Sequence, residues 1–384
     1  MQELIDKYLK GDKTIWTVVI LLTLASTVIA LSASSNMAYR LTEGNATPFW
    51  FKHVATLVLG FVMMIYLQHF KFKYFSRISQ MGIWVAGVLL LMTLLFGKNI
   101  NSAQRWIMGF QPSDLAKIVL ILYVARLLTI KHDKLHDFKE GVLPLIIPIA
   151  GICILILPAD FSTAFMLGAA SFILLFVGGV KLKHLLAVVG GAVVLFMLLI
   201  MVNKATGILP RATTWETRMV SFFGGGEAEG ENEEAKIDNY QANQAKAAVV
   251  NGGLFGTKPG RGNIKNDMYS SQSDFVFSTI IEEFGSIFGG LILLLLYLTF
   301  FFRSIRVALK AESSFGAYVA FGLSFLLVLQ AMINMGVGVN LLPVTGQPLP
   351  LISMGGTSIL FTCISIGILL NVSKSVESNE KQLA

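Results

Sequence analysis

The sequence predicts an all-α polytopic membrane protein with about ten transmembrane helices, both termini in the cytoplasm and a large extracytoplasmic loop between helices 7 and 8. Three observations lead to this fold class. Of 384 residues, 54% are hydrophobic and only 14% are charged. Apolar runs of about 18 residues or more recur along the chain. Basic residues gather in alternate connections between those runs. A soluble domain could not bury so much apolar surface.

Ten stretches match the roughly 20 residues that an α-helix needs to cross the hydrocarbon core of a bilayer. The first has no small-residue cleavage pattern after it, so we expect a retained span and not a removed signal peptide. The predicted spans are 14–32, 50–68, 78–97, 112–130, 141–158, 162–180, 184–202, 274–302, 314–336 and 355–372.

The connections between spans differ in their content of Lys and Arg. Lys71, Lys73 and Arg77 follow the second span, and similar clusters precede the first and follow the fourth, sixth, eighth and tenth. The intervening loops hold far fewer basic residues. The positive-inside rule therefore places both termini in the cytoplasm. The net charge of +7 follows this alternation, and we expect no nucleic-acid partner.

Residues 203–273 form an outer loop of about 70 residues within what we predict to be a single transmembrane domain, residues 1–384. The Gly- and Glu-rich stretch 224–239 has the composition of a mobile segment. Tyr240 to Val250 has helical spacing, and GGLFGTKPGRG reads as a turn region. We expect this second half of the loop to be ordered and to pack over the mouth of the helix bundle.

Acidic residues stand where the loop meets the eighth span, in YSSQSDFVFSTIIEEFG. Asp274 opens that span, where it could cap the helix by accepting hydrogen bonds from first-turn amides. It could equally act as a general base at the outer surface, and the two roles are compatible. Glu282 and Glu283 follow two turns deeper and point to different faces. A charge in a span is costly, so at least one must face the protein interior and find a partner.

Further charged residues lie at the predicted outer ends of spans. Asp114 and Lys117 are three positions apart on one helix, where they could form a structural ion pair or line a cavity for an anionic head group. Arg105 could bind phosphate or simply be solvated. Asp160, in a tight connection, could serve the turn itself.

The outer segment 334–358 is rich in Gly, Pro and Asn at membrane depth. Non-helical backbone there must be buried in protein or line a wet cavity. Gly355 and Gly356 precede Ser358 and could start a helix whose free amides bind an anion. Because the costly polar groups all belong to the outer half, we expect a polar cavity that accepts an amphiphile with a lipid tail and a charged, sugar-bearing head.

Several stretches together resemble the SEDS family of peptidoglycan glycosyltransferases: AQRWI, QPSDLAK, DFSTA, YQANQAKAAVVNGGLFG, SDFVFSTIIEEFG and NLLPVTGQPLPLISMGGTS. By this resemblance Asp274 is the catalytic base. Two departures stand out: Asp114 replaces the more usual Glu, and YSSQS replaces the usual residues before Asp274. The resemblance, with the polar positions above, gives a substrate-binding set of Arg105, Asp114, Lys117, Asp160, Arg218, Glu283 and Ser358.

The resemblance implies polymerisation of lipid II into glycan strands in the bacterial plasma membrane. IIEEFG and YQANQAK are closer to the division type than to the elongation type, which implies work at the septum. Implied partners are membrane lipids, a class B penicillin-binding protein and an activator complex of small bitopic proteins. A divalent cation, Mg²⁺ or Mn²⁺, stays open, since no dedicated metal cage is visible. Two rival functions stay open as well: a flippase for a lipid-linked precursor, and a non-enzymatic scaffold for a transpeptidase.

Overall fold

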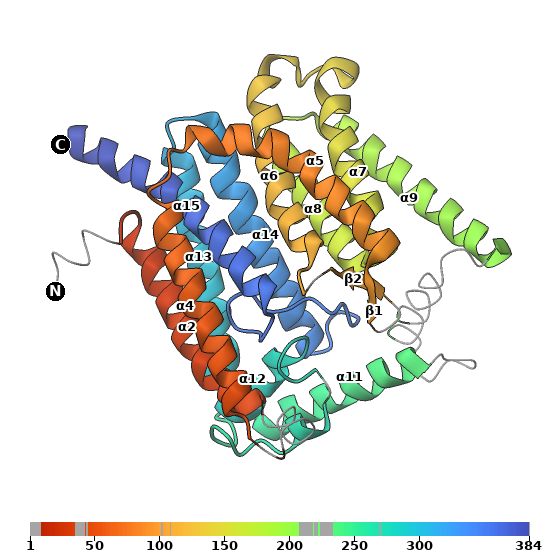
Figure 1. The fold of residues 1–384 in the computed structure, drawn as a ribbon, viewed down its shortest axis with the longest axis vertical. Coiled ribbons are helices and arrows are strands. Elements are labelled where there is room, and N and C mark those ends of the chain that lie inside the picture. Colours follow the sequence, from red (N-terminus) through yellow and green to blue (C-terminus); the bar gives the residue numbers. More distant parts are fainter. Residues whose placement is uncertain are drawn as a thin grey trace. The chain divides into compact units, whose positions relative to one another are not determined.

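The chain is helical along most of its length in the computed structural model (Figure 1). The structure describes residues 9–34, 43, 45–100, 103–107, 109–206, 218, 222, 233–268 and 270–383. These residues divide into two compact units. Unit 1 draws on Met1–Phe70, Ser221–Glu312 and Leu323–Ala384, and unit 2 on Lys71–Val220 and Ser313–Gly322. The single domain expected from the sequence stays a prediction.

Unit 1 contains long apolar helices together with the ordered part of the outer loop. α4 packs against α15, and Gly60 of α4 permits this close approach, because a Cβ there would lie 2.5 Å from the Sγ of Cys363. The elements of unit 1 are α2 (Lys13–Ala33), α4 (Thr47–Leu67), α11 (Glu233–Gly252), η3 (Ile264–Asp267), α12 (Val276–Gly285), η4 (Ser286–Leu291), α13 (Ile292–Lys310), most of α14 (Ser314–Gly338) and α15 (Thr357–Leu383).

Unit 2 is organised around α6 (Pro112–Ile130), which contacts α5, α7 and α8. Thirteen of the 19 residues of α6 are buried, so α6 is the central helix of this unit. Its other elements are α5 (Lys73–Phe96), β1 (Lys98–Ile100), β2 (Ala103–Trp106), η1 (His132–Lys134), η2 (Phe138–Val142), α7 (Leu143–Ile156), α8 (Phe161–Val177) and α9 (Leu182–Thr206). β1 and β2 form an antiparallel hairpin that was not predicted from the sequence.

Each of the ten predicted spans coincides with helical structure, which confirms the all-α membrane fold. Within the described residues, seven helical stretches are long and apolar enough to cross a bilayer. The other three predicted spans correspond to α6, which carries three charged residues, to the shorter apolar helix α8, and to α9, whose apolar stretch Leu182–Leu198 is also short. Three limits were wrong by five residues or more: the third helix begins at Lys73, the helix of the eighth span ends at Lys310 and the last helix continues to Leu383.

The prediction that the eighth span is one straight helix was also wrong, because the chain turns sharply at Gly285. This residue has φ +80°, a value that glycine adopts without steric cost. A Cβ on Gly289 would lie 2.8 Å from the carbonyl oxygen of Ile280, although nine positions of straight helix would separate the two by about 13 Å. α12 therefore folds back along the start of the next helix, and its glutamates do not lie two turns into a straight span.

The described part of the outer loop includes a long helix that begins at Glu233. α11 confirms the helix predicted at Tyr240–Val250, and turns follow it up to Arg261 as expected. The prediction that 224–239 is mobile was wrong for 233–239, which belong to α11. Glu, Ala and Lys favour helix, and acidic residues suit the first turn of a helix. Residues 224–232 lie outside the described residues. α11 lies alongside α12 in unit 1 (Figure 1).

Candidate functional site

Asp274 lies in the turn that leads into α12 and is half-buried. The N-cap residue of α12 is Phe275, so Asp274 lies one position before the cap and not at it as predicted. The carboxylate instead lies beside the 340–356 segment. Its Oδ2 is 3.8 Å from the position that a Cβ on Gly346 would take. A glycine at this position leaves room next to the carboxylate.

The backbone around Asp274 is held by polar side chains from α14 and from the segment before α15. Nδ2 of Asn334 donates to the carbonyl oxygens of Asp274, at 3.0 Å, and of Gln347, at 2.7 Å. Oγ of Ser353 donates to the carbonyl oxygen of Ser273 at 2.7 Å. Asn334 and Ser353 are buried, so these bonds are protected from competition with water. The position of Asp274 is thereby fixed from two directions.

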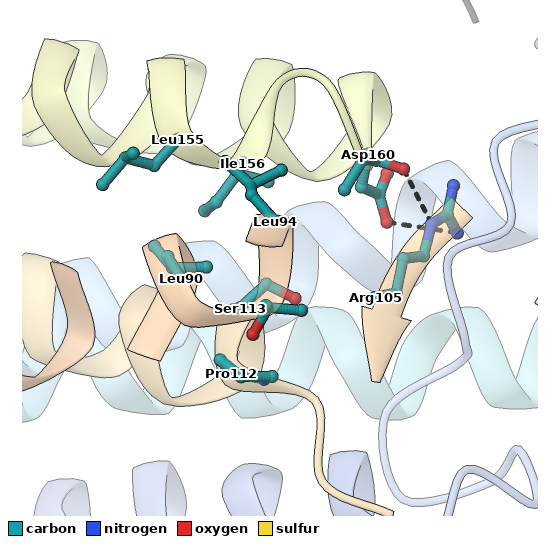
Figure 2. A pocket seen from close by; sticks show the side chains of 10 residues that line it. Leu90, Leu94, Arg105, Pro112, Ser113, Leu155, Ile156 and Asp160 are labelled. Carbon is teal, nitrogen blue, oxygen red and sulfur yellow. Dashed lines mark hydrogen bonds and ion pairs between the residues drawn. The ribbon is translucent and has the colours of Figure 1, made fainter. Parts of the chain in front are cut away.

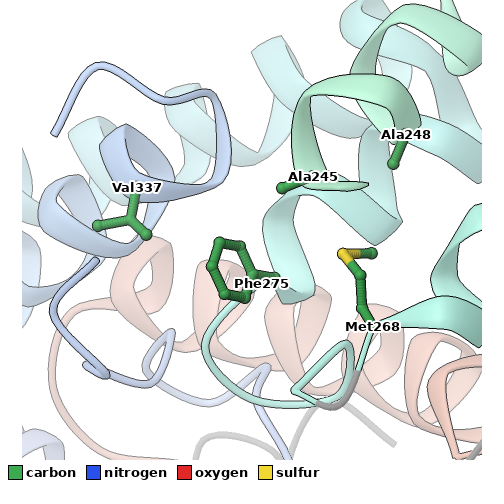
Figure 3. Packing of buried hydrophobic residues seen from close by; sticks show 5 residues of the cluster. All are labelled: Ala245, Ala248, Met268, Phe275 and Val337. Carbon is green, nitrogen blue, oxygen red and sulfur yellow. The ribbon is translucent and has the colours of Figure 1, made fainter. Parts of the chain in front are cut away.

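An apolar cluster anchors the same turn from beneath (Figure 3). Phe275, next to Asp274, is 1% exposed and packs with Ala245 and Ala248 of α11, Met268, and Val337 of α14. Burying an aromatic side chain of this size contributes roughly 1.5–3 kcal/mol. Two neighbouring residues of one turn therefore lie in different surroundings: Phe275 is buried within the protein, and Asp274 is partly exposed.

The two glutamates of α12 are both buried and both have partners, which confirms the expectation that at least one faces the interior. Glu282 accepts hydrogen bonds from the backbone amides of Ile264 and Lys265, at 3.0 and 3.1 Å, and from Nδ2 of Asn251. Glu283 forms an ion pair with Nζ of Lys265, at 2.5 Å, and accepts a hydrogen bond from Ser32 of α2. Together they fasten the outer loop to α12.

Arg105 and Asp160 are paired with each other in unit 2 (Figure 2). Nη1 of Arg105 lies 3.3 Å from Oδ2 of Asp160, and its Nε donates to the carbonyl oxygen of Ala159 at 2.8 Å. Oδ1 of Asp160 also accepts from the amide of Thr163 and so caps α8. The predicted turn role of Asp160 is confirmed. Arg105 is about one quarter exposed and is held in a defined orientation.

Asp114 and Lys117 form the ion pair that their spacing on α6 predicts. Nζ of Lys117 lies 2.8 Å from Oδ1 of Asp114, and both side chains are less than one tenth exposed. The second oxygen of Asp114, Oδ2, is buried and has no hydrogen-bond partner within the described residues. A buried carboxylate oxygen of this kind is costly, so a group that reached it with a donor would bind favourably.

Two further predicted substrate-binding residues have less defined surroundings. Ser358 lies in the first turn of α15, which begins at Thr357 after Gly355 and Gly356, as expected. Its amide donates to the carbonyl oxygen of Gly355 at 3.0 Å. Arg218 is helical and half-buried and belongs to unit 2, but its flanking residues lie outside the described part of the chain.

Asp274 and Glu283 belong to unit 1, whereas Arg105, Lys117 and the residues paired with them belong to unit 2. The cavity that we expect Asp274 to share with Arg105 and Lys117 therefore stays a prediction. Among the described residues, no three His, Cys, Asp or Glu side chains gather in a way that could hold a metal ion.

Sequence reasoning missed four residues that hold the segments around the candidate base and its helix. Asn334 and Gln330 are polar residues at i and i+4 on an apolar helix, and that pattern was a usable signal of a functional or anchoring role. Lys265 gave no such signal, because it is a single Lys in a turn-rich loop, 18 positions from Glu283. Ser353 also gave no distinct signal in the sequence, because it is one of several polar residues in the 340–356 segment.

Comparison with protein families and with named relatives gives one consistent result. A family model described as "Cell cycle protein", built on FtsW, RodA and SpoVE, matches residues 12–378. The chain is 33% identical to the probable peptidoglycan glycosyltransferase FtsW of Geobacter metallireducens, across 96% of this chain and 95% of that protein. It is 29% identical to the stage V sporulation protein E of Bacillus subtilis, across 82% of this chain and 84% of that protein.

Solved structures share the fold. A chain of a peptidoglycan synthase complex matches with a TM-score of 0.71 at 24% identity, covering 95% of this chain and 98% of that chain. The rod shape determining protein RodA of Thermus thermophilus matches with a TM-score of 0.67 at 22% identity, covering 96% of this chain and 98% of that chain. At such identities the likeness concerns the fold alone.

Proposed function

Because the chain belongs to the family of cell cycle proteins that includes FtsW, RodA and SpoVE, we propose that it is a peptidoglycan glycosyltransferase of the FtsW type. It polymerises lipid II into glycan strands during septal cell-wall synthesis. The observation that carries the proposal is Asp274: a half-exposed acidic residue in a polytopic membrane protein, in a turn whose backbone is held in place by two buried polar side chains.

In the reaction, the 4-hydroxyl of the GlcNAc on an acceptor lipid II attacks C1 of the MurNAc on the donor. Undecaprenyl pyrophosphate leaves with the electron pair of the broken C–O bond. Asp274 takes the proton of the attacking hydroxyl as the new bond forms. General-base assistance of this kind contributes about 10²–10⁴-fold to a rate, or roughly 3–5 kcal/mol of barrier.

The departing pyrophosphate carries the charge that must be stabilised. Arg105 and Lys117 are the cations that we assign to it, with Asp160 and Asp114 holding each in position. Arg218, Ser358 and Glu283 complete the proposed substrate-binding set, and Glu283 acts through Lys265 and the outer loop. A divalent cation held partly by the substrate phosphates would add positive charge at the same place.

Partners and location belong to the same proposal. A chain with the same fold comes from a peptidoglycan synthase complex, which supports a class B penicillin-binding protein as the partner of this chain. The proposed site of action is the division septum of the plasma membrane, with a complex of small bitopic proteins as activator. The similarity to FtsW proteins supports the division type.

The test is lipid II polymerisation in detergent by the purified full chain with its transpeptidase partner. Wild type should make glycan strands, and Asp274→Ala and Asp274→Asn should lose at least 100-fold of the rate. Asp133→Ala, which removes an exposed carboxylate within η1, is the matched control and should behave like wild type. Equal polymer from Asp274→Ala and wild type would overturn the assignment.

The two rival functions make different predictions in related experiments. Detergent removes the two sides of the membrane, so a flippase would build no glycan there. A scaffold would still support growth when Asp274→Asn replaces the wild-type chain at normal abundance. Loss of growth despite normal binding of the transpeptidase would exclude the scaffold.

A further inference from the structure

A cleft of about 520 Å³ lies in unit 1 at the ends of the helices opposite the outer loop. The start of α2, the end of α13 and the later part of α15 form its walls. The positive-inside rule predicts this face to be cytoplasmic. We propose that this cleft binds the phosphate-bearing head group of an anionic phospholipid from the inner leaflet.

The charge of the lining favours an anion. Four basic side chains line the cleft against two acidic ones, which leaves an excess of two positive charges: Lys13, Arg303, Arg306 and Lys310 against Asp12 and Glu377. Basic residues next to the cytoplasmic ends of spans attract anionic lipids, and basic pockets between transmembrane helices bind their head groups. A phosphodiester accepts hydrogen bonds from several such cations at once.

Both acidic residues of the lining are already engaged in holding the cleft together. Asp12 caps α2 through the amide of Thr14, at 2.8 Å, and accepts from the Arg303 guanidinium at 2.5 and 3.1 Å. Glu377 accepts from the amide of Gly11 at 3.2 Å. These contacts tie α2, α13 and α15 into one preformed wall.

The surface of α13 indicates that the ligand carries acyl chains. Leu291, Leu295, Leu298 and Phe302 are all exposed at spacings of four, three and four, so they form one stripe along η4 and α13. In a membrane protein such a stripe faces lipid. Arg306 continues it by four positions, and its guanidinium lies 4.6 Å from the ring centre of Phe302. The lipid-facing stripe thus leads directly into the basic cleft, as a head group with attached tails requires.

The test titrates the full chain, purified in a neutral detergent, with phosphatidylglycerol in mixed micelles and follows its melting temperature by tryptophan fluorescence. Each Lys or Arg near an anionic lipid surface contributes about fivefold in affinity. Arg306→Gln/Lys310→Gln should therefore need about 30-fold more phosphatidylglycerol for the half-maximal rise. Lys181→Gln/Lys183→Gln removes two exposed basic residues from the same predicted face, outside the cleft, and should match wild type.

Three results would overturn the proposal. The first is an Arg306→Gln/Lys310→Gln midpoint equal to that of wild type. The second is an equal effect of phosphatidylcholine, which carries no net charge. The third is an equal effect of inorganic phosphate, which would identify a soluble anion as the ligand. If the double variant does not fold, Lys310→Gln alone should shift the midpoint about fivefold, and an unchanged midpoint in that variant also overturns the proposal.

Discussion

Lys265 and Glu283 form an ion pair, 2.5 Å between Nζ and Oε1, in which both side chains are 3% exposed or less. One residue comes from the outer loop and the other from α12, and Ser32 of α2 contacts both. Three separate parts of unit 1 thus meet at one buried charge pair. This contact joins the loop to the helix that follows Asp274.

We expect Lys265→Met to destabilise the protein by about 3–5 kcal/mol, because it leaves the Glu283 carboxylate buried without its cation. Lys265→Met/Glu283→Leu should recover most of that loss, since apolar residues of similar volume often replace a buried pair at little cost. Thermal unfolding of the purified chain measures both. Lys134→Met removes an exposed partner of Glu140 and is the control, with no measurable change expected. A double variant as unstable as Lys265→Met would contradict this account.

Gly285→Ala should disrupt the turn between α12 and η4. Its φ of +80° strains any residue with a Cβ, and that Cβ would lie 2.3 Å from the carbonyl oxygen of Leu254. We expect a protease to cut the outer loop faster in this variant, because the loop no longer packs closely on α12. Gly87→Ala is the matched control, because nothing lies within 4 Å of its Cβ position, and helix propensity even favours it by about 1 kcal/mol. Unchanged proteolysis of Gly285→Ala would show that the turn tolerates a side chain.

Asn334→Ala should slow polymerisation more than it weakens substrate binding, because Asn334 positions Asp274 without touching the substrate. It leaves the carbonyl oxygens of Asp274 and Gln347 without this donor, at a cost of about 1–3 kcal/mol each. The measurement is kcat against KM for lipid II. Gln330→Ala, one turn away, removes a bond to the carbonyl oxygen of Pro348 and should lower stability with kcat largely kept. A fall in kcat of equal size in both variants would argue against a specific role for Asn334.

Asp160→Asn and Asp160→Ala separate the two contacts of Asp160. Asn retains the cap of α8, since Asn and Asp are similarly good N-cap residues, but it loses the charge that faces Arg105. Ala loses both. We therefore expect Asp160→Ala to be less stable than Asp160→Asn by about 1 kcal/mol in thermal unfolding. Equal stability of the two variants would mean that the cap contributes nothing.

Features that depend on neighbours along the chain could be predicted from the amino-acid sequence. The helices were predictable because a lipid-spanning helix satisfies its own backbone hydrogen bonds and needs a continuous apolar run. The Asp114–Lys117 pair was predictable because three positions bring two side chains to one helix face. The helix start at Thr357 followed from the two glycines before it.

Contacts between residues far apart in sequence could not be predicted and are seen in the folded chain alone. The Lys265–Glu283 pair, the bond from Asn334 to the Asp274 carbonyl and the turn at Gly285 all depend on how the outer loop and the 340–356 segment pack onto α12. No local pattern encodes these contacts, because their energies depend on burial and on donors that come from 18 to 60 positions away. The same holds for the start of α12, where Phe275 and not Asp274 is the N-cap residue.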